Sequence, residues 1–335
     1  MNFDDVWINA ISYYTPERIL TNQDFERIVD TTDSWITQRT GIKERRIAAD
    51  NQATSDLAVA AGRRALEQAQ VSPEEIDFII LATFTPDMPL PAAACLVQMK
   101  LGATRAAAFD VSASCSGFLY GLSVASGLIA SKQGKKALVL AADILSRVTD
   151  YQDRRTCVLF GDGACAALVQ TKKTGFGFKL VSLKIKTEPS GFDLLTIPGG
   201  GSKQPPSSYT LKQRLHYVKM NGNKVYSFAV RGMYEFAMSA LHDAGIQPKD
   251  IGLFVPHQAN SRIIHSVRLR LGLSEKQVYI NLPRYGNTSA ASVGIALAEA
   301  ISEQRVQSGD YVLMVTFGGG FTLAGAVLKA KDSND

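Results

Sequence analysis

The sequence predicts an α/β protein made of two similar halves. Its 335 residues, 46% of them hydrophobic and 20% charged, have the size and balance of an ordinary globular α/β chain with a large core. A pattern of helix, turn and strand at residues 66–82 recurs at residues 241–255, with leucine, alanine, proline and isoleucine at matching spacings. A similar order of elements follows each copy, which indicates an internal repeat.

The first half shows a series of strands around one apolar helix. The run at residues 78–82 has the length and composition of a buried strand, and the apolar stretch at residues 106–111 predicts a second one. Small residues then form a tight turn, and an almost wholly apolar helix runs to about residue 131. A basic turn at residues 132–136 leads into a strand at residues 137–141.

The second half repeats this order. Strands are predicted at residues 253–255 and 278–281, followed by a turn at residues 286–288 and a helix that runs to about residue 304. The strand at residues 311–317 completes the series. The central helices of both halves are rich in small residues and apolar nearly all round, as expected of helices buried between sheets.

Cys115 stands at the turn before the first apolar helix, within D-V-S-A-S-C-S-G-F. A thiol on the first turn of a helix faces unpaired N–H groups and the positive end of the macrodipole, so we expect a lowered pKa and a nucleophilic role. An isolated cysteine is more often an inert part of the core. His257 in V-P-H-Q-A-N and Asn287 in Y-G-N-T-S-A-A-S favour the reactive alternative, because the repeat places their segments where they can converge with Cys115.

A run of three glycines, Gly318, Gly319 and Gly320, follows the strand at residues 311–317. Consecutive glycines let a backbone N–H approach a ligand closely, as an oxyanion hole requires. A hairpin turn before a strand at residues 323–328 is the simpler explanation, but a hairpin does not need three glycines.

Composition excludes several classes of protein. The four cysteines lie in apolar contexts without C-x-x-C spacing, which favours reduced thiols over a disulfide framework or a zinc site. Asp4 and Asp5 stand where a signal peptide needs a basic region, and no apolar run is long enough to span a membrane. The net charge of +5 without a long basic run argues against nucleic-acid binding but leaves an acidic protein or a phosphorylated ligand as partner. We therefore expect a cytoplasmic protein that is neither exported nor inserted in a membrane.

Together these motifs resemble the β-ketoacyl-[acyl-carrier-protein] synthase III family of the thiolase superfamily. The resemblance spans the chain and includes W-I-T-Q-R-T-G-I-K-E-R-R at residues 35–46, F-G-D-G-A at residues 160–164 and F-G-G-G-F-T at residues 317–322. It implies a five-layered αβαβα thiolase-like fold with pseudo-symmetric halves at residues 1–176 and 177–335, and a homodimer.

The resemblance also implies a mechanism. Cys115 takes an acyl group from an acyl-CoA primer, and the backbone N–H groups of Cys115 and Gly319 form the oxyanion hole. His257 and Asn287 then stabilise the enolate formed when malonyl-acyl-carrier-protein loses CO₂, and this enolate attacks the acyl-cysteine. The product is the β-ketoacyl chain that initiates fatty-acid synthesis. No metal or redox cofactor is implied, and coenzyme A takes part only as a substrate carrier.

Further residues are carried over as binding positions. The expected coenzyme A contacts are Trp35, Arg39, Arg154, Asn223 and Asn260, with Arg155 as an alternative to its neighbour. The expected dock for an acidic carrier protein is the basic helix that carries Arg262, Arg268 and Arg270. Phe160 is placed in the acyl pocket, and Leu90 is placed on a lid that reaches across the dimer, where a bulky aromatic accompanies short primers. Leu90 is smaller, so we expect primers bulkier than acetyl.

Relatives with other chemistry differ at identifiable residues. A thiolase would have a second cysteine just before the glycine run, where this chain has Thr316 and Phe317, and an elongating ketosynthase would have histidine in place of Asn287. A papain-type hydrolase shares the three side-chain types but not the cysteine context. A non-catalytic partner subunit would usually lack the nucleophile. A homologue that uses a non-acetyl primer in a secondary-metabolite, signal-molecule or biotin-precursor pathway remains the alternative function.

Overall fold

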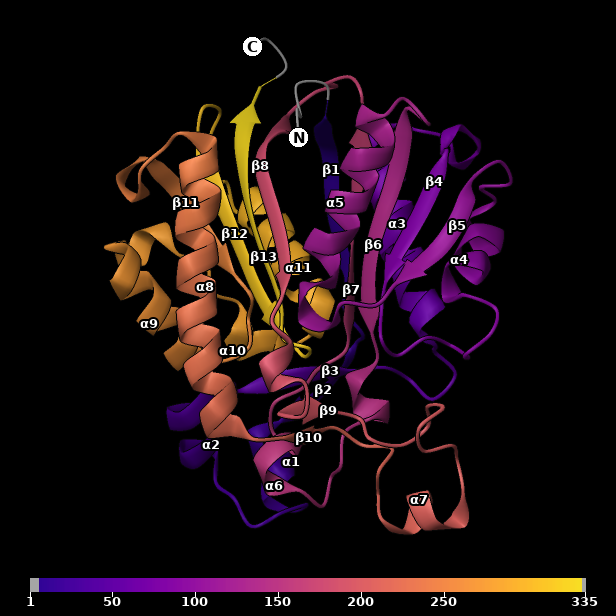
Figure 1. The fold of residues 1–335 in the computed structure, drawn as a ribbon, viewed down its shortest axis with the longest axis vertical. Helices are drawn as coiled ribbons and strands as arrows, with labels where there is room; N and C mark the ends of the chain where they lie inside the picture. The colour runs from indigo at the N-terminus through magenta and orange to yellow at the C-terminus, as the bar shows by residue number, and fades with distance from the viewer. Residues whose placement is uncertain (1–5, 333–335) are drawn as a thin grey trace.

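The structure, a computed structural model, describes residues 6–332 and is built around a mixed sheet of nine strands (Figure 1). The order is β11-β12-β13-β8-β1-β7-β6-β4-β5. The strands are β1 Trp7–Tyr14, β4 Phe78–Ala82, β5 Ala107–Val111, β6 Lys136–Asp143, β7 Gly163–Gln170, β8 Gly177–Thr187, β11 Ile251–Pro256, β12 Tyr311–Gly318 and β13 Thr322–Lys331. Asp4 and Asp5, which carry the expectation about the N-terminus, lie outside the described residues.

The sheet has two parts that share a four-strand topology, and β5 extends only the first part. They join where β1 meets β8, at the pairs Trp7↔Lys179 and Ile8↔Phe178. Outward from this junction, β1-β7-β6 and β8-β13-β12 each run antiparallel, and β4 and β11 then add in parallel to β6 and β12. The repeat read from the sequence is therefore present in the order and direction of the strands.

Helices form three layers around these two parts of the sheet (Figure 1). On the outer faces, α3 (Thr54–Ala69) and α4 (Ala93–Leu101) pack on the first part, while α8 (Gly222–Ala244) and α9 (Ser261–Leu271) pack on the second. Between the two parts lie α5 (Gly117–Ala130) and α11 (Ser292–Ser302), which share one apolar core with strands of both. The five-layered expectation and the burial of both small-residue helices are confirmed.

One predicted strand is absent. Of residues 278–281, only Val278 makes a β-bridge, in parallel with Phe254. Tyr279 N–H still donates to the Phe254 carbonyl at 3.0 Å, but beyond it the buried Gln258 Oε1 accepts the backbone N–H groups of Asn281 and Leu282 at 3.1 and 3.2 Å. These groups are therefore not available to a strand ladder, and the chain turns into α10 (Leu282–Tyr285).

Shorter elements gather at one end of the large sheet, in the lower part of Figure 1. They form the antiparallel pairs β2 with β3 and β9 with β10, together with short helices. Their bounds are β2 Arg18–Thr21, α1 Asn22–Glu26, α2 Asp33–Thr40, β3 Glu44–Ile47, α6 Arg154–Cys157, β9 Leu195–Thr196, α7 Ser208–Lys212 and β10 Lys219–Met220. Several of these elements line the cavity described next.

Candidate active site

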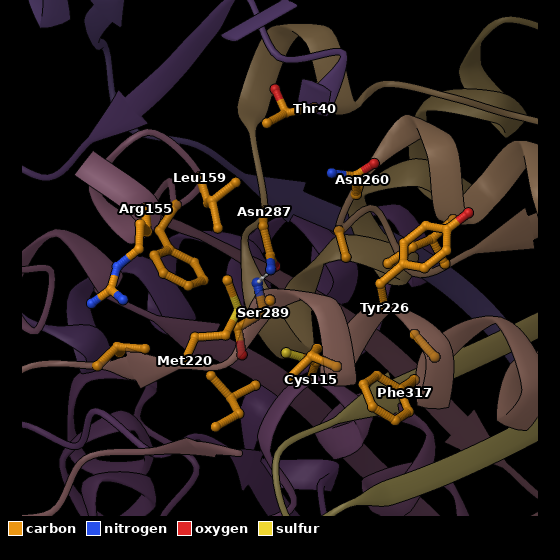
Figure 2. Close-up of a pocket in the computed structure, with 18 of the residues that line it drawn as sticks. Thr40, Cys115, Arg155, Leu159, Met220, Tyr226, Asn260, Asn287, Ser289 and Phe317 are labelled. Atoms are coloured by element: carbon orange, nitrogen blue, oxygen red, sulfur yellow. Dashed lines mark hydrogen bonds between the residues drawn. The ribbon is translucent and has the colours of Figure 1, made fainter. Parts of the chain in front are cut away.

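A cavity of about 710 Å³ opens between the ends of the sheet and the shorter elements (Figure 2). Side chains from both halves reach it, and in Figure 2 Cys115 and Asn287 extend into it from different elements. The predicted site residues that line it are Trp35, Arg39, Cys115, Phe160, Asn223, His257, Asn260, Arg262 and Asn287. The predicted residues Leu90, Arg154, Arg268, Arg270 and Gly319 are not part of its wall.

Cys115 lies in a 3-10 turn, Ser114–Ser116, that connects β5 to α5. The second half has the same turn at Ser289–Ala291 before α11, and the first residue of each has a positive φ, 49° for Ser114 and 50° for Ser289. A serine rarely adopts this left-handed conformation. The two turns pack against each other, as the sequence analysis expected, and Ala290 is the residue equivalent to Cys115.

The Cys115 turn is held by the start of β13. Thr322 Oγ1 donates a hydrogen bond to the Ala113 carbonyl at 2.9 Å, and Ser116 Oγ donates one to the Thr322 carbonyl at 3.1 Å. Both bonds are buried, so they fix the backbone on either side of the thiol.

The expected lowering of the Cys115 pKa is wrong. Burial raises the pKa of this thiol to about 12, because the thiolate has little water around it. The neighbouring Ser289 hydroxyl opposes this rise, and the negative charge of buried Asp143 adds to it. The thiol of the unliganded site is therefore protonated at neutral pH and has to lose its proton during the attack itself.

His257 lies directly after β11, and its backbone N–H donates to the Val315 carbonyl at 2.8 Å. Its ring is buried, and burial lowers the pKa of His257 to about 3. The imidazole is therefore neutral at physiological pH, with one ring nitrogen protonated. Ring atom Nδ1 lies 2.6 Å from Ser292 Oγ.

Asn287 is held in a defined orientation. Its Oδ1 accepts the backbone N–H of Ser289 at 2.9 Å, which is the dashed line in Figure 2. Because Oδ1 is occupied, the Nδ2 group is the part of the amide that remains for a ligand. The backbone of Asn287 forms an isolated parallel β-bridge with Phe160. In this bridge the Asn287 N–H donates to the Leu159 carbonyl, and the Gly161 N–H donates to the Asn287 carbonyl. The site thus contains two side chains suited to donate hydrogen bonds beside one thiol.

The glycine run packs directly on the Cys115 turn. A Cβ atom on Gly318 would lie 2.7 Å from the Cys115 nitrogen, and one on Gly319 would lie 3.1 Å from Ser114 Oγ. Any larger residue at Gly318 would therefore displace the turn. The role of Gly319 in an oxyanion hole stays a prediction.

Aromatic and basic residues lie at another part of the cavity. The Arg154 guanidinium lies over the Trp35 ring at 4.4 Å and the Arg39 guanidinium at 5.0 Å. Arg154 pairs with Asp30 at 3.7 Å, whereas Arg155 lines the cavity and binds Asp153. The two arginines thus share the region, one stacked on the indole and the other on the wall.

Asn260 connects two elements of this region. Its side-chain oxygen accepts the Arg262 N–H as the cap of α9, and its Nδ2 donates to the Arg39 carbonyl at 3.0 Å. The amide therefore holds α2 against α9, in addition to lining the cavity. Asn223 lies in the first turn of α8 on the same wall.

The three arginines of α9 do not form one surface. Arg262 lines the cavity with its guanidinium over the Tyr226 ring at 5.7 Å, and Arg270 is exposed. Arg268 is turned inward, with only 11% of its side chain exposed, and donates to the Leu273 carbonyl at 2.8 Å beyond the end of the helix. The expectation that Arg268 docks a carrier stays a prediction, although its inward-turned guanidinium, which binds beyond the end of α9, favours a structural role.

One section of the cavity wall is apolar. The residues that pack there in one cluster are Phe84, Leu145, Phe160, Leu195, Ile197 and Val218. The side chain of Leu90 is 84% exposed and lies outside this wall, so within a single chain it does not shape the cavity.

Several of these wall residues were not predicted from the sequence. Phe84 and Leu145 follow β4 and β6, and ligands of α/β proteins commonly bind beyond the carboxyl ends of strands, so this position was a usable signal. Asp143 Oδ1 fixes Phe84 by accepting its backbone N–H at 3.0 Å together with the hydroxyls of Thr83 and Thr85. The segment between β8 and α8 also contributes to the wall, and no local sequence pattern predicts this. Its wall residues are Leu195, Thr196, Ile197, Val218 and Met220.

Residues 6–332 contain neither a cluster of metal ligands nor a membrane-spanning helix. No group of three or more histidine, cysteine, aspartate or glutamate side chains there is arranged to hold a metal ion. Across the same residues, the helices are all too short or too polar to cross a bilayer. All four cysteines are free thiols, with Cys95 exposed and the other three buried.

Two family models match the chain. The one described as 3-oxoacyl-[acyl-carrier-protein (ACP)] synthase III matches residues 109–189, and the one for the C terminal of the same synthase matches residues 241–330. The β-ketoacyl-[acyl-carrier-protein] synthase III of Caldanaerobacter subterraneus subsp. tengcongensis is 50% identical over 316 residues, 94% of this chain and 95% of that protein. That of Symbiobacterium thermophilum is 51% identical over 329 residues, covering 98% and 99%.

A solved structure agrees with these matches. The crystal structure of 3-oxoacyl-[acyl-carrier-protein] synthase III from Aquifex aeolicus is similar with a TM-score of 0.88 and 42% identity. The similarity covers 97% of this chain and 99% of that one. Sequence and fold are therefore similar over nearly the whole chain.

Proposed function

The chain belongs to the 3-oxoacyl-[acyl-carrier-protein] synthase III family, and we propose that it condenses an acyl-CoA primer with malonyl-acyl-carrier-protein to initiate a fatty acid. One observation carries the residue roles. A buried thiol, Cys115, shares a cavity with a neutral imidazole, His257, and an oriented amide, Asn287, and the cavity has a polar section and an apolar section.

In the first step Cys115 Sγ attacks the thioester carbonyl of the acyl-CoA. A carbon–sulfur bond forms to the protein, the bond to coenzyme A breaks, and the thiol proton leaves with the coenzyme A sulfur. Because burial raises the pKa of Cys115 to about 12, a standing thiolate does not start this step. The backbone N–H groups of Cys115 and Gly319 hold the oxyanion of the tetrahedral intermediate.

In the second step His257 and Asn287 hold the malonyl thioester. Each donates a hydrogen bond to the thioester oxygen, His257 from Nε2 and Asn287 from Nδ2. The carboxylate leaves as CO₂, and its electron pair forms an enolate on that oxygen. The enolate carbon attacks the acyl-Cys115 carbonyl, the β-ketoacyl product departs, and Cys115 takes up a proton. A neutral His257 suits this role, since the charge arises only during the step.

The binding partners follow from the same surfaces. We assign the adenine of coenzyme A to the indole of Trp35 with Arg154 and Arg39, and the acidic carrier protein to Arg262 and Arg270. Both reactions balance without a metal or a redox cofactor. Reduced thiols in both steps suit a cytoplasmic enzyme.

We also propose a homodimer formed through the edge of the first part of the sheet. β5 is the last strand there, so one side of it is unpaired by any strand of residues 6–332. The apolar side chains of Met88, Leu90 and Met99 are exposed in the preceding loop and on α4. A second copy seated on this edge would cover them and bring Leu90 to the partner's cavity.

The test separates the two half-reactions by mass spectrometry of residue 115. Cys115→Ser should form no stable acyl-thioester from acetyl-CoA. His257→Ala and Asn287→Ala should still acylate but should lose condensation with malonyl-acyl-carrier-protein. Either of these two variants condensing at the normal rate would overturn the assigned roles, and an inactive wild type would overturn the proposed function.

A further inference from the structure

Ser292, the first residue of α11, makes a buried contact with the proposed second-step donor. The Ser292 side chain is 1% exposed, and its Oγ lies 2.6 Å from His257 Nδ1. The backbone N–H of Gln258 also points at this oxygen and donates to it at 3.4 Å. Ser292 thus contacts His257 and the residue that follows it.

These contacts decide where the hydroxyl hydrogen goes. The Gln258 N–H can only donate, so it uses a lone pair of Ser292 Oγ. The hydroxyl hydrogen then has His257 Nδ1 as the acceptor that the structure provides among the described residues. If Nδ1 carried the proton instead, Ser292 Oγ would face two donors and its own hydrogen would be buried without a partner.

The protonation of the ring follows. His257 is neutral, because burial lowers the pKa of this imidazole to about 3, so only one ring nitrogen carries hydrogen. With Nδ1 as an acceptor, that hydrogen sits on Nε2. This is the nitrogen that donates to the malonyl thioester in the proposed second step.

We infer that Ser292 is a positioning residue that fixes His257 in the Nε2–H tautomer and sets the orientation of its ring. The inference rests on the proposed function, which assigns to His257 Nε2 the hydrogen bond to the malonyl thioester. One turn then orients both donors, since the Ser289 N–H holds Asn287 Oδ1 and the Ser292 hydroxyl holds His257 Nδ1. A tautomer error at His257 would leave a lone pair facing the thioester oxygen and the enolate charge.

The test compares Ser292→Ala with Ser292→Thr and a matched control. Ser126→Ala removes another fully buried hydroxyl of a central helix. The Ser126 hydroxyl donates to the Leu122 carbonyl at 2.7 Å, and Ser126 does not line the cavity. Ser292→Ala should lower kcat for condensation by roughly 10- to 100-fold, the range found when the hydrogen-bond partner that orients a metal-bound histidine is removed. Acylation of Cys115 should change less than about twofold, because it does not use the His257 donor, and the control should condense normally. Ser292→Thr keeps the hydroxyl and should recover most of the rate.

Nitrogen NMR of histidine-labelled protein supplies a readout that a packing defect would not move. In the wild type the His257 signals should show a protonated Nε2 and an unprotonated Nδ1, and in Ser292→Ala a mixture of both tautomers. An Nδ1–H signal in the wild type, or unchanged condensation in Ser292→Ala, would overturn the inference. Equal loss of both half-reactions with a lowered Tm would also overturn it, in favour of a packing role. A wild type that acylates but never condenses would instead refute the proposed function.

Discussion

The reactivity of Cys115 should rise with pH over the whole range in which the protein stays folded. Burial raises the pKa of this thiol to about 12, so at pH 8 about one thiol in 10⁴ is ionised, compared with about one in four for a free cysteine of pKa about 8.5. A less acidic thiol gives a more nucleophilic thiolate, with a Brønsted slope of about 0.4–0.5. Over the difference of about 3.5 pKa units, this slope makes the Cys115 thiolate about 40-fold more reactive than the thiolate of a free cysteine. Cys115 should therefore react about 60-fold more slowly than a free thiol at pH 8.

The assay is thiol exchange with methyl methanethiosulfonate between pH 6 and pH 9.5, quenched and read by peptide mass spectrometry. Below its pKa, a thiol gains about tenfold in rate per pH unit, so the profile should be a straight line of slope one on logarithmic axes. Limited access lowers the whole line but does not bend it, which makes the slope the diagnostic quantity. Exposed Cys95 reports that the reagent is active, and Cys115→Ser identifies the peptide. A rate that levels off below pH 9 would refute the reasoning and mean that the helix N-terminus outweighs burial.

Two further predictions concern the choice of primer, one concerns use of the carrier protein, and one concerns stability. Phe84→Ala should raise kcat/KM for octanoyl-CoA relative to acetyl-CoA by at least roughly tenfold, because it enlarges the apolar wall. Leu90→Phe should shift preference towards acetyl-CoA only through a partner subunit, since Leu90 lies outside its own cavity, and an unchanged ranking of acetyl-, butyryl- and octanoyl-CoA would remove it from the acyl pocket. Charge reversal at Arg262 or Arg270 should weaken use of malonyl-acyl-carrier-protein and reduce its salt dependence while sparing acylation by acyl-CoA, and equal damage to both would point to a structural or coenzyme A role. Arg268→Ala should instead lower the free energy of unfolding by about 1 kcal/mol, measured by urea denaturation, with carrier use unchanged.

Much of the architecture could be predicted from the sequence, because the repeat of helix, turn and strand is a local pattern. The end of the strand expected at residues 278–281 could not, because the backbone N–H groups of Asn281 and the following Leu282 are taken by the side chain of Gln258, more than 20 residues earlier. Periodicity describes which residues are buried. It does not describe which side chain satisfies a backbone group.

The site shows the same division. Motifs identified Cys115, His257 and Asn287 as residues that converge, and the cavity contains all three. The direction of the Cys115 pKa was wrong because the helix N-terminus is visible in the sequence, whereas the burial that outweighs it depends on tertiary packing. The structural contact of Arg268 could not be predicted for a similar reason, since three arginines on one helix look alike in the sequence and only the fold shows that one of them binds the chain beyond α9.

The duplicated turn bears on how the nucleophile is made. Strain beside a catalytic residue is readily taken for a device that activates it. Here Ser114, next to the cysteine, and Ser289, next to an alanine, have nearly the same positive φ. A half of the molecule without a nucleophile has kept the same conformation, so the strain belongs to the connection between sheet and central helix. The positive φ beside Cys115 is therefore a requirement of the backbone connection, and it does not depend on which side chain the next residue carries.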